Sequence, residues 1–150
     1  MMLNEPNTAS ILLQATAVLN ICTSCRPKGM PRDPAHERPG YQLYMTLRDI
    51  IAASPLADSV CVQPVSCMSL CPRPCAISFA SQGRWSYLFG DQHCESAATD
   101  VPACLEHYLH DSEGKLPREG RPMSLRASIL GRVPPLDVNS ATAPDAPGSR

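Results

Sequence analysis

Short apolar runs separated by proline-containing stretches extend along most of the chain. Runs of this length, bounded by residues that favour turns, are typical of strands buried in a sheet. They predict four strands, at residues 15–21, 60–65, 76–80 and 85–89. The first strand leads directly into Cys22, and the four residues between the last two strands have the composition of a hairpin turn.

Two other segments repeat apolar residues at the spacing of one helix face. In the first segment these residues are Leu43, Leu47, Ile50 and Ile51, and in the second they are Val101, Leu105, Tyr108 and Leu109. We expect the first helix to end near Ala53, because Ser54 and Pro55 follow. Asp100 is the expected N-cap of the second helix, and Pro102 is tolerated in its first turn.

The predicted elements follow in the order strand, helix, strand, strand, strand and helix. One β-α-β crossover, one hairpin and a closing helix predict an α/β fold, in which two main helices cover a small mixed four-stranded sheet. A thioredoxin-like arrangement fits this order. Residues 11–135 form the domain, with residues 112–135 docked on it as an extension. Residues 1–10 and 136–150 have little apolar surface to bury, so we expect a mobile leader and a disordered, proline-rich C-terminal tail.

Composition and charge narrow the range of partners and compartments. Of the 150 residues, 43% are hydrophobic, which is enough for a buried core. Thirteen basic and fourteen acidic side chains give a net charge of −1, so no overall field attracts the chain to nucleic acid or to an anionic membrane. No apolar run approaches the length of about eighteen residues that a membrane span needs, and no basic flank marks a secretory signal. We therefore expect a cytoplasmic protein with reduced thiols.

Eight cysteines are the most unusual feature of the composition. Cys22 and Cys25 form a C-x2-C pair at the end of the first strand, and Cys67, Cys71 and Cys75 form a C-x3-C-x3-C series after the second strand. Two close pairs on loops at strand ends are able to converge on one metal centre, because each pair fixes two thiolates and the fold supplies the other two. Four thiolates suit either a tetrahedral zinc site or an iron–sulfur cluster.

Each group of cysteines has an alternative interpretation. Cys22 and Cys25 are also compatible with a thiol–disulfide oxidoreductase motif, but a reactive thiolate normally lies at a helix N-terminus, and Cys25 leads into a proline-rich loop. The three cysteines of the second loop are alternatively thiols without a function. The other three, which we expect to pack as small hydrophobic residues, are Cys61, Cys94 and Cys104.

Two further segments bear on this cysteine chemistry. Residues 26–38 hold four basic side chains against two acidic ones. They form either an ordinary solvated loop or a positively charged segment beside an anionic four-thiolate centre. In the second case their charge stabilises the centre and presents a surface on which a partner docks. The segment YLFGD, from Tyr87 to Asp91, is interpreted as core residues followed by a turn glycine. Asp91 is alternatively a hydrogen-bonding partner of the metal loop.

Several segments together carry a resemblance to a known family: CTSC, RPGYQL, CMSLCPRPCAISF, YLFGD and RVPP. They resemble the predicted bacterial metal-binding proteins of domain-of-unknown-function family 1636, over about Ala15 to Pro135. That family is similar to thioredoxin-like [2Fe–2S] ferredoxins, in which a first-loop cysteine pair and a C-x3-C pair hold the cluster. By position, the resemblance implies four metal ligands, Cys22, Cys25, Cys67 and Cys71, with Cys75 as an alternative ligand. It also connects the chain to cobalt and cobalamin metabolism.

The sequence contains no Ser-His-Asp arrangement, glycine-rich phosphate loop or H-E-x-x-H motif, so we expect no enzyme. The pattern favours a cysteine-ligated metal protein, first of all a [2Fe–2S] ferredoxin-like electron carrier with a redox or metal-pathway protein as its partner. The alternative is a zinc- or cobalt-binding protein that handles metal or has a structural role without electron transfer. A thiol–disulfide oxidoreductase is the third hypothesis. Neither nucleic acid nor a membrane is an expected partner, and a homodimer is compatible with the sequence.

Overall fold

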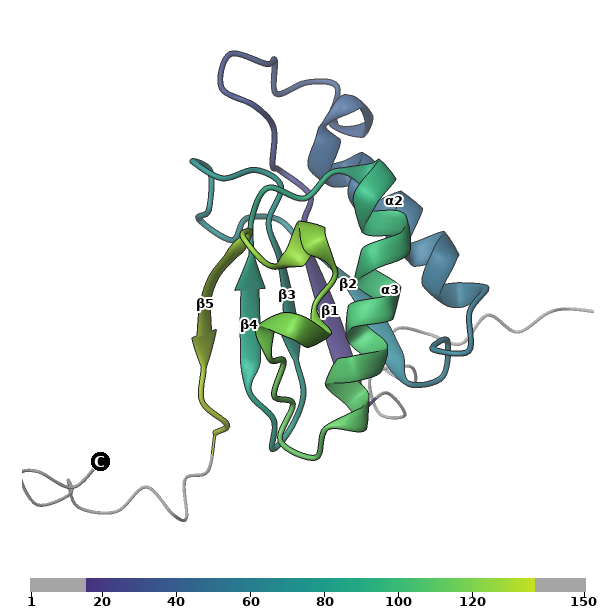
Figure 1. Ribbon diagram of the computed structural model, residues 1–150. Helices are drawn as coiled ribbons and strands as arrows, with labels where there is room; N and C mark the ends of the chain where they lie inside the picture. The colour runs from purple at the N-terminus through teal and green to yellow at the C-terminus, as the bar shows by residue number, and fades with distance from the viewer. Residues whose placement is uncertain (1–15, 137–150) are drawn as a thin grey trace, which may run out of the picture.

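Two long helices lie side by side on one face of a five-stranded sheet (Figure 1). The structure is a computed structural model that describes residues 16–136 of the chain. Its strands are β1 (Ala17–Cys22), β2 (Val60–Val65), β3 (Ile77–Ala80), β4 (Ser86–Phe89) and β5 (Ile129–Val133). The long helices are α2 (Pro39–Ala52) and α3 (Cys94–His110), and the short 3-10 helices are η1 (Ala35–Glu37), η2 (Arg118–Gly120) and η3 (Met123–Leu125).

The sheet topology brings four strand ends to one end of the molecule. The strand order is β2-β1-β3-β4-β5; β1 and β2 are parallel, and all other neighbours are antiparallel. The C-terminal ends of β1 and β2 therefore meet, with Cys22 opposite Val65. The start of β3 and the end of β4 lie at the same end, because Ile77 pairs with both Ile21 and Phe89. The loops at the top of Figure 1 extend from this end of the sheet.

The core lies between the sheet and the two helices. Strand residues such as Leu19 and Phe79 are fully buried, whereas their neighbours Val18 and Ser78 are half-buried. The helices contribute most of their predicted apolar stripes to this core, namely Leu43, Leu47 and Ile51 from α2 and Val101, Leu105 and Tyr108 from α3. Full burial of one such side chain stabilises the fold by about 1.5–3 kcal/mol, so these stripes fix the helices on the sheet.

Aromatic side chains form a cluster at the centre of the core. The ring centroids of Phe79 and Phe89 are 5.2 Å apart, and Tyr108 meets Tyr87 edge to face at 6.2 Å. Tyr108 Oη donates a hydrogen bond to the Trp85 carbonyl oxygen at 2.6 Å. Burial raises the pKa of Tyr108 to about 12, so the phenol stays protonated and keeps donating this bond at neutral pH.

The predicted α/β class with two main helices is confirmed, but the prediction of a four-stranded sheet is wrong. β5, from within residues 112–135, adds a fifth strand beside β4. It lies at the sheet edge and is held by backbone pairing, which is interrupted by an irregularity between Leu88 and Phe89. The Arg132 guanidinium also lies 4.3 Å from the centroid of the Trp85 ring. An edge strand of this kind needs no regular apolar alternation, so the sequence pattern did not reveal it.

The second helix begins earlier than its sequence pattern suggested. The prediction of Asp100 as its N-cap is wrong, because α3 starts at Cys94. Asp100 lies inside the helix, where its carboxylate accepts a hydrogen bond from Ser124 Oγ at 2.5 Å. Pro102 is also internal and removes one helical hydrogen bond. Burial of Ala97 in the core, on the N-terminal side of Pro102, compensates by holding the early turns in place.

The predicted ends of the chain are mostly beyond what the structure describes. The leader at residues 1–10, and all but the first residue of the tail at residues 136–150, lie outside the described part and stay predictions. From residue 16 to residue 136, no helix is long and apolar enough to cross a membrane.

Candidate metal centre

The C-x2-C pair begins at the last residue of β1, Cys22, and ends at Cys25, directly after the turn that follows. Cys22 N–H donates to Ala76 O at 3.0 Å, and Cys25 O accepts a hydrogen bond from Gly40 N–H at the start of α2, at 2.9 Å. Cys22 and Cys25 are both buried. A Cβ atom on Gly40 would lie 2.9 Å from Cys25 N and closer still to Cys22 O. Only glycine therefore lets the first turn of α2 approach this turn so closely.

The loop between β2 and β3 lies directly beside this turn. Thr23 N–H donates to the last carbonyl of β2 at 2.8 Å, and the Ser24 hydroxyl donates to Ser66 O. The parallel register of β1 and β2 produces this arrangement, because it makes both strands end at the same level. The two cysteine-bearing loops are thus neighbours, as the sequence predicted.

Three thiols from these loops are neighbours: the Cys75 thiol donates to Cys25 O at 4.0 Å, and the thiols of Cys22 and Cys75 both shift the pKa of Cys25. The hydrogen bond with Cys25 and burial raise the pKa of Cys22 far above its ordinary value. For Cys25, the bond with Cys22 lowers the pKa, but the bond with Cys75 and burial prevail and raise it. The bond with Cys25 lowers the pKa of Cys75 despite burial. Negative charge in this trio is therefore best accommodated at Cys75.

Cys67 and Cys71 are exposed on the second loop. Cys67 Sγ accepts a hydrogen bond from Ser69 N–H at 3.4 Å. A cavity of about 600 Å³, formed by both loops, has Cys71 and Cys25 in its walls. The other side chains in these walls include apolar Pro27, Met30, Pro72 and Pro74 and basic Arg26 and Lys28. The cavity therefore joins one member of each cysteine group.

The basic loop at residues 26–38 supplies one wall of this cavity. Arg26 Nε donates to Met30 O at 3.0 Å, so its guanidinium is turned onto its own loop. Arg38 pairs with Asp33 at 3.5 Å. Of the basic side chains in this loop, Arg26 and Lys28 line the cavity together with Cys25 and Cys71.

The structure brings together only part of the predicted ligand set. Cys22 and Cys25 are in contact as expected, but their third thiol neighbour is Cys75, while Cys71 shares only the cavity and Cys67 is exposed. In the described range, no group of three His, Cys, Asp or Glu side chains is arranged to hold an ion. The donor chemistry nevertheless fits a thiolate-ligated centre, because five soft sulfur donors lie on two adjacent loops. Backbone N–H donors, such as Ala76 N–H to Cys25 Sγ at 3.4 Å, also stabilise thiolate charge as they do around iron–sulfur clusters.

The three isolated cysteines lie in or next to regular elements. Cys61 and Cys104 are buried, and Cys94 is half-buried at the first residue of α3. Burial raises the pKa of Cys104 to about 12, which is typical of an unreactive thiol. These positions agree with a packing role.

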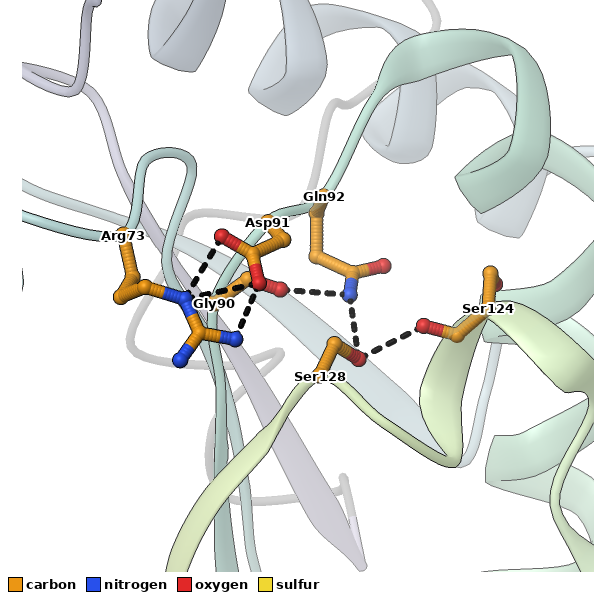
Figure 2. A network of polar contacts seen from close by, with 6 residues as sticks. All are labelled: Arg73, Gly90, Asp91, Gln92, Ser124 and Ser128. Atoms are coloured by element: carbon orange, nitrogen blue, oxygen red, sulfur yellow. Dashed lines mark hydrogen bonds and ion pairs between the residues drawn. The ribbon is translucent and has the colours of Figure 1, made fainter.

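The YLFGD turn holds the second cysteine loop in place (Figure 2). Arg73 lies between Cys71 and Cys75 in the sequence, and its Nε donates to both carboxylate oxygens of Asp91, at 2.9 and 2.8 Å. Asp91 N–H in turn donates to Arg73 O at 3.0 Å. The Arg73 guanidinium lowers the pKa of Asp91, so the carboxylate is charged at neutral pH. The expectation that Asp91 hydrogen-bonds this loop is confirmed.

Gln92 extends this network from Cys75 to the C-terminal segment. Its N–H donates to Cys75 O at 3.1 Å, and its side-chain Nε2 donates to Gly90 O at 2.9 Å and to Ser128 Oγ at 3.1 Å. Ser128 Oγ donates to Ser124 O at 2.6 Å (Figure 2). The segment before β5 therefore supports the backbone at Cys75 through one buried amide.

Sequence reasoning missed Gly40 and Gln92, because neither residue type is a metal ligand. The available signals were the place of Gly40 directly after Pro39, at a helix start, and the place of Gln92 directly after YLFGD.

Comparison with known proteins gives a family and a fold. A family model described as Protein of unknown function (DUF1636) matches residues 19–135, which is more than half of the chain. The chain is similar to a solved thioredoxin-like [2Fe–2S] ferredoxin from Aquifex aeolicus at 17% identity, with a TM-score of 0.52, over 81% of this chain and 96% of that one. A structure of the wild-type thioredoxin-like [2Fe–2S] ferredoxin from Aquifex aeolicus gives 16% identity and a TM-score of 0.50, over 78% and 98%. No match was found among curated proteins. The thioredoxin-like fold predicted from the element order is confirmed.

Proposed function

We propose that this chain, which belongs to the DUF1636 family of proteins of unknown function, binds a [2Fe–2S] cluster at its two cysteine loops and carries electrons. The main support is the position of these loops at one end of the sheet, where hydrogen bonds from Thr23 and Ser24 tie them together. Two solved proteins that share the fold are thioredoxin-like [2Fe–2S] ferredoxins. The donor set and the fold therefore favour the same function.

The proposed ligands come from both loops and are Cys22, Cys25, Cys67 and Cys71, with Cys75 as the alternative. When bound, the cluster supplies reversible one-electron transfer. The protein contributes burial of the first pair, which keeps water from that side of the centre. The basic wall with Arg26 and Lys28 offsets part of the negative charge of a four-thiolate centre.

A zinc- or cobalt-binding protein without electron transfer is the second candidate. The proximity of Cys25 to both Cys22 and Cys75 favours it, because thiolates are soft donors that zinc and cobalt accept without an iron–sulfur cluster. Such a protein would handle metal or use it for stability.

Thiol–disulfide exchange is the third candidate. The start of α2 lies against the C-x2-C turn, contrary to the expectation that Cys25 leads only into a proline-rich loop, and a helix N-terminus favours a thiolate. However, the pKa values of Cys22 and Cys25 are both raised, chiefly by their neighbouring thiols and by burial. An attacking thiolate is therefore disfavoured at this pair.

We also propose a cytoplasmic location, a redox or metal-pathway protein as partner, and no role for nucleic acid or a membrane. The small net charge supports this choice, since it provides no overall attraction to polyanions. A link to cobalt or cobalamin metabolism and a homodimer belong to the same proposal.

The deciding experiment is anaerobic purification followed by metal, sulfide and absorption measurements. Thiolate-ligated ferric iron absorbs strongly in the visible range, whereas zinc, with a filled d shell, is colourless. We expect red-brown protein that contains iron and acid-labile sulfide and bleaches with dithionite. A colourless protein with stoichiometric zinc would contradict electron transfer and favour the second candidate.

Serine variants identify the ligands. Replacement of any of Cys22, Cys25, Cys67 or Cys71 removes a soft donor and is expected to lose most of the metal. Cys104→Ser is the matched control, because it also changes one thiol to a hydroxyl but lies in α3, away from the two loops. Loss of metal in Cys75→Ser, with Cys67→Ser or Cys71→Ser unaffected, would assign Cys75 to the ligand set instead. Full occupancy after loss of both Cys67 and Cys71 would end the proposal for this quartet.

A further inference from the structure

The thiols of Cys25 and Cys75 form a contact that the proposed ligand set does not explain. The Cys75 thiol donates to Cys25 O at 4.0 Å, and the Cys25 and Cys75 thiols each shift the pKa of the other. Ala76 N–H donates to Cys25 Sγ at 3.4 Å, which holds this sulfur at the start of β3, next to Cys75. Each of the two cysteines is only 4% exposed. The pair is therefore fixed in place and shielded from bulky reagents.

The cavity between the loops gives access to one member of this pair. Cys25 is in its wall, and Cys75 is not. The cavity volume of about 600 Å³ is many times that of a water molecule, which occupies about 30 Å³ in the liquid. Hydrogen peroxide is not much larger than water, so it enters freely. A small oxidant therefore meets Cys25 first, and Cys75 lies behind it.

We propose that Cys25 and Cys75 are a site of reversible oxidation, at which hydrogen peroxide forms a disulfide in the metal-free protein. Because the neighbouring Cys75 thiol and burial raise the pKa of Cys25, only a small fraction of Cys25 is thiolate and the oxidation is slow. This thiolate attacks one peroxide oxygen and breaks the O–O bond; a sulfenic acid forms, and the other oxygen leaves as water with the proton that the thiol released. The Cys75 sulfur then attacks the Cys25 sulfur, and the sulfenic hydroxyl leaves as a second water with the Cys75 proton. Two thiols are thereby oxidised to one disulfide, and one peroxide is reduced to two waters.

The disulfide removes Cys25 from the metal ligands, so that metal loading requires a reductant. This consequence rests on the proposed function, whereas the disulfide itself does not. Bound metal acts in the opposite direction, because a coordinated thiolate is no longer free to attack the peroxide. Cys75 thus has a role even if it is not a ligand, because it holds Cys25 in a disulfide that thiol reductants cleave.

The test uses the full-length protein after removal of metal under reducing conditions. The protein is treated with hydrogen peroxide, free thiols are blocked with iodoacetamide, and a tryptic digest is analysed without reduction. Trypsin does not cleave before proline, so Cys22 and Cys25 stay in peptide 1–28 and Cys75 stays in peptide 49–84. We expect two of the eight thiols to disappear and these two peptides to be joined. A cross-link confined to one peptide, or no cross-link, refutes the proposal.

Serine variants then locate the linked residues. Cys25→Ser and Cys75→Ser are expected to lose the cross-link, whereas Cys22→Ser and Cys71→Ser keep it. In Cys75→Ser the reaction stops at the sulfenic acid on Cys25, which dimedone traps, so the variant gives a positive signal of its own. A cross-link between the peptides that persists in Cys75→Ser, or absence of the dimedone adduct at Cys25, overturns the assignment.

Uptake of zinc chloride by oxidised protein, before and after dithiothreitol, measures the effect on loading. We expect uptake to be lost on oxidation and restored by the reductant. Equal uptake by both forms refutes control of loading even where the disulfide is found. Reduced protein that takes up no zinc, and that contains no iron after anaerobic purification, contradicts the proposed function instead, and the cross-link is still measurable in that case.

Discussion

Replacement of Gly40 by alanine tests whether the close approach of α2 holds the C-x2-C turn in place. The added Cβ would lie 2.9 Å from Cys25 N and 3.1 Å from Cys25 Cβ, and nearer still to Cys22 O. Carbon atoms in contact are normally about 3.5–4.0 Å apart, so one of the two segments has to move. Most of the overlapping atoms belong to the backbone, and no rotation of a side chain relieves the clash.

Two effects of opposite sign determine how much Gly40→Ala changes the free energy of unfolding. Overpacking of a well-packed site costs about 1–3 kcal/mol. Alanine recovers at most about 1 kcal/mol through its higher helix propensity, and less than that in the first turn. We therefore expect Gly40→Ala to lower the free energy of unfolding by about 1–2 kcal/mol. Because the displaced atoms belong to Cys22 and Cys25, metal content should fall more than this loss of stability alone explains.

Urea unfolding and metal analysis of the same preparations measure both effects. Gly131→Ala is the matched control, since a Cβ at Gly131 in β5 meets nothing within 4 Å. It should unfold like the natural protein and keep its metal. A Gly40→Ala variant that is as stable as this control and retains full metal would refute the conclusion that close approach of α2 shapes the site.

Three further predictions concern other contacts. Arg73 lowers the folded-state pKa of Asp91, so this carboxylate stabilises the fold above its unfolded pKa of about 4, and the contribution is lost as the pH falls through the folded value. Asp91→Asn should therefore unfold at lower urea than the natural protein at neutral pH, and this difference should shrink as the pH falls below the unfolded pKa of about 4; a difference that does not change with pH would contradict this. Tyr108→Phe removes the donor to Trp85 O and should cost about 1 kcal/mol in urea unfolding, without a change in metal content. Cys104→Ser should also keep its metal and cost about 1–3 kcal/mol, because it leaves a hydroxyl in the core; unchanged stability would show that the hydroxyl finds a partner.

The elements that bury a periodic apolar stripe were predictable from the sequence. The elements held by backbone pairing or by packing of small residues were not. β2 has the predicted bounds, Val60–Val65, and α2 buries most of the predicted stripe, because burial imposes a period on apolar residues. β5 depends on backbone pairing at an edge, and the first turns of α3 depend on packing of small residues such as Ala97. Neither effect leaves a periodic signal in the sequence.

The candidate site was likewise predictable only in part. Spacing and strand order were sufficient to place two cysteine groups side by side, since the register of β1 and β2 follows from the crossover. They did not indicate that Cys75 rather than Cys71 contacts Cys25, because the path of an irregular loop depends on contacts distant in sequence. Here those contacts come from Asp91 and Gln92, which hold the loop at Arg73 and at Cys75.

The link from Ser128 through Gln92 to Cys75 makes the second cysteine loop dependent on residues that are translated later. Ser128 follows Cys75 by 53 residues, so the ribosome has released all five loop cysteines well before this support exists. At synthesis rates of about 5–20 residues per second, these thiols spend seconds on an unfinished chain. For the proposed cluster, stable insertion is therefore expected only after β5 has been translated.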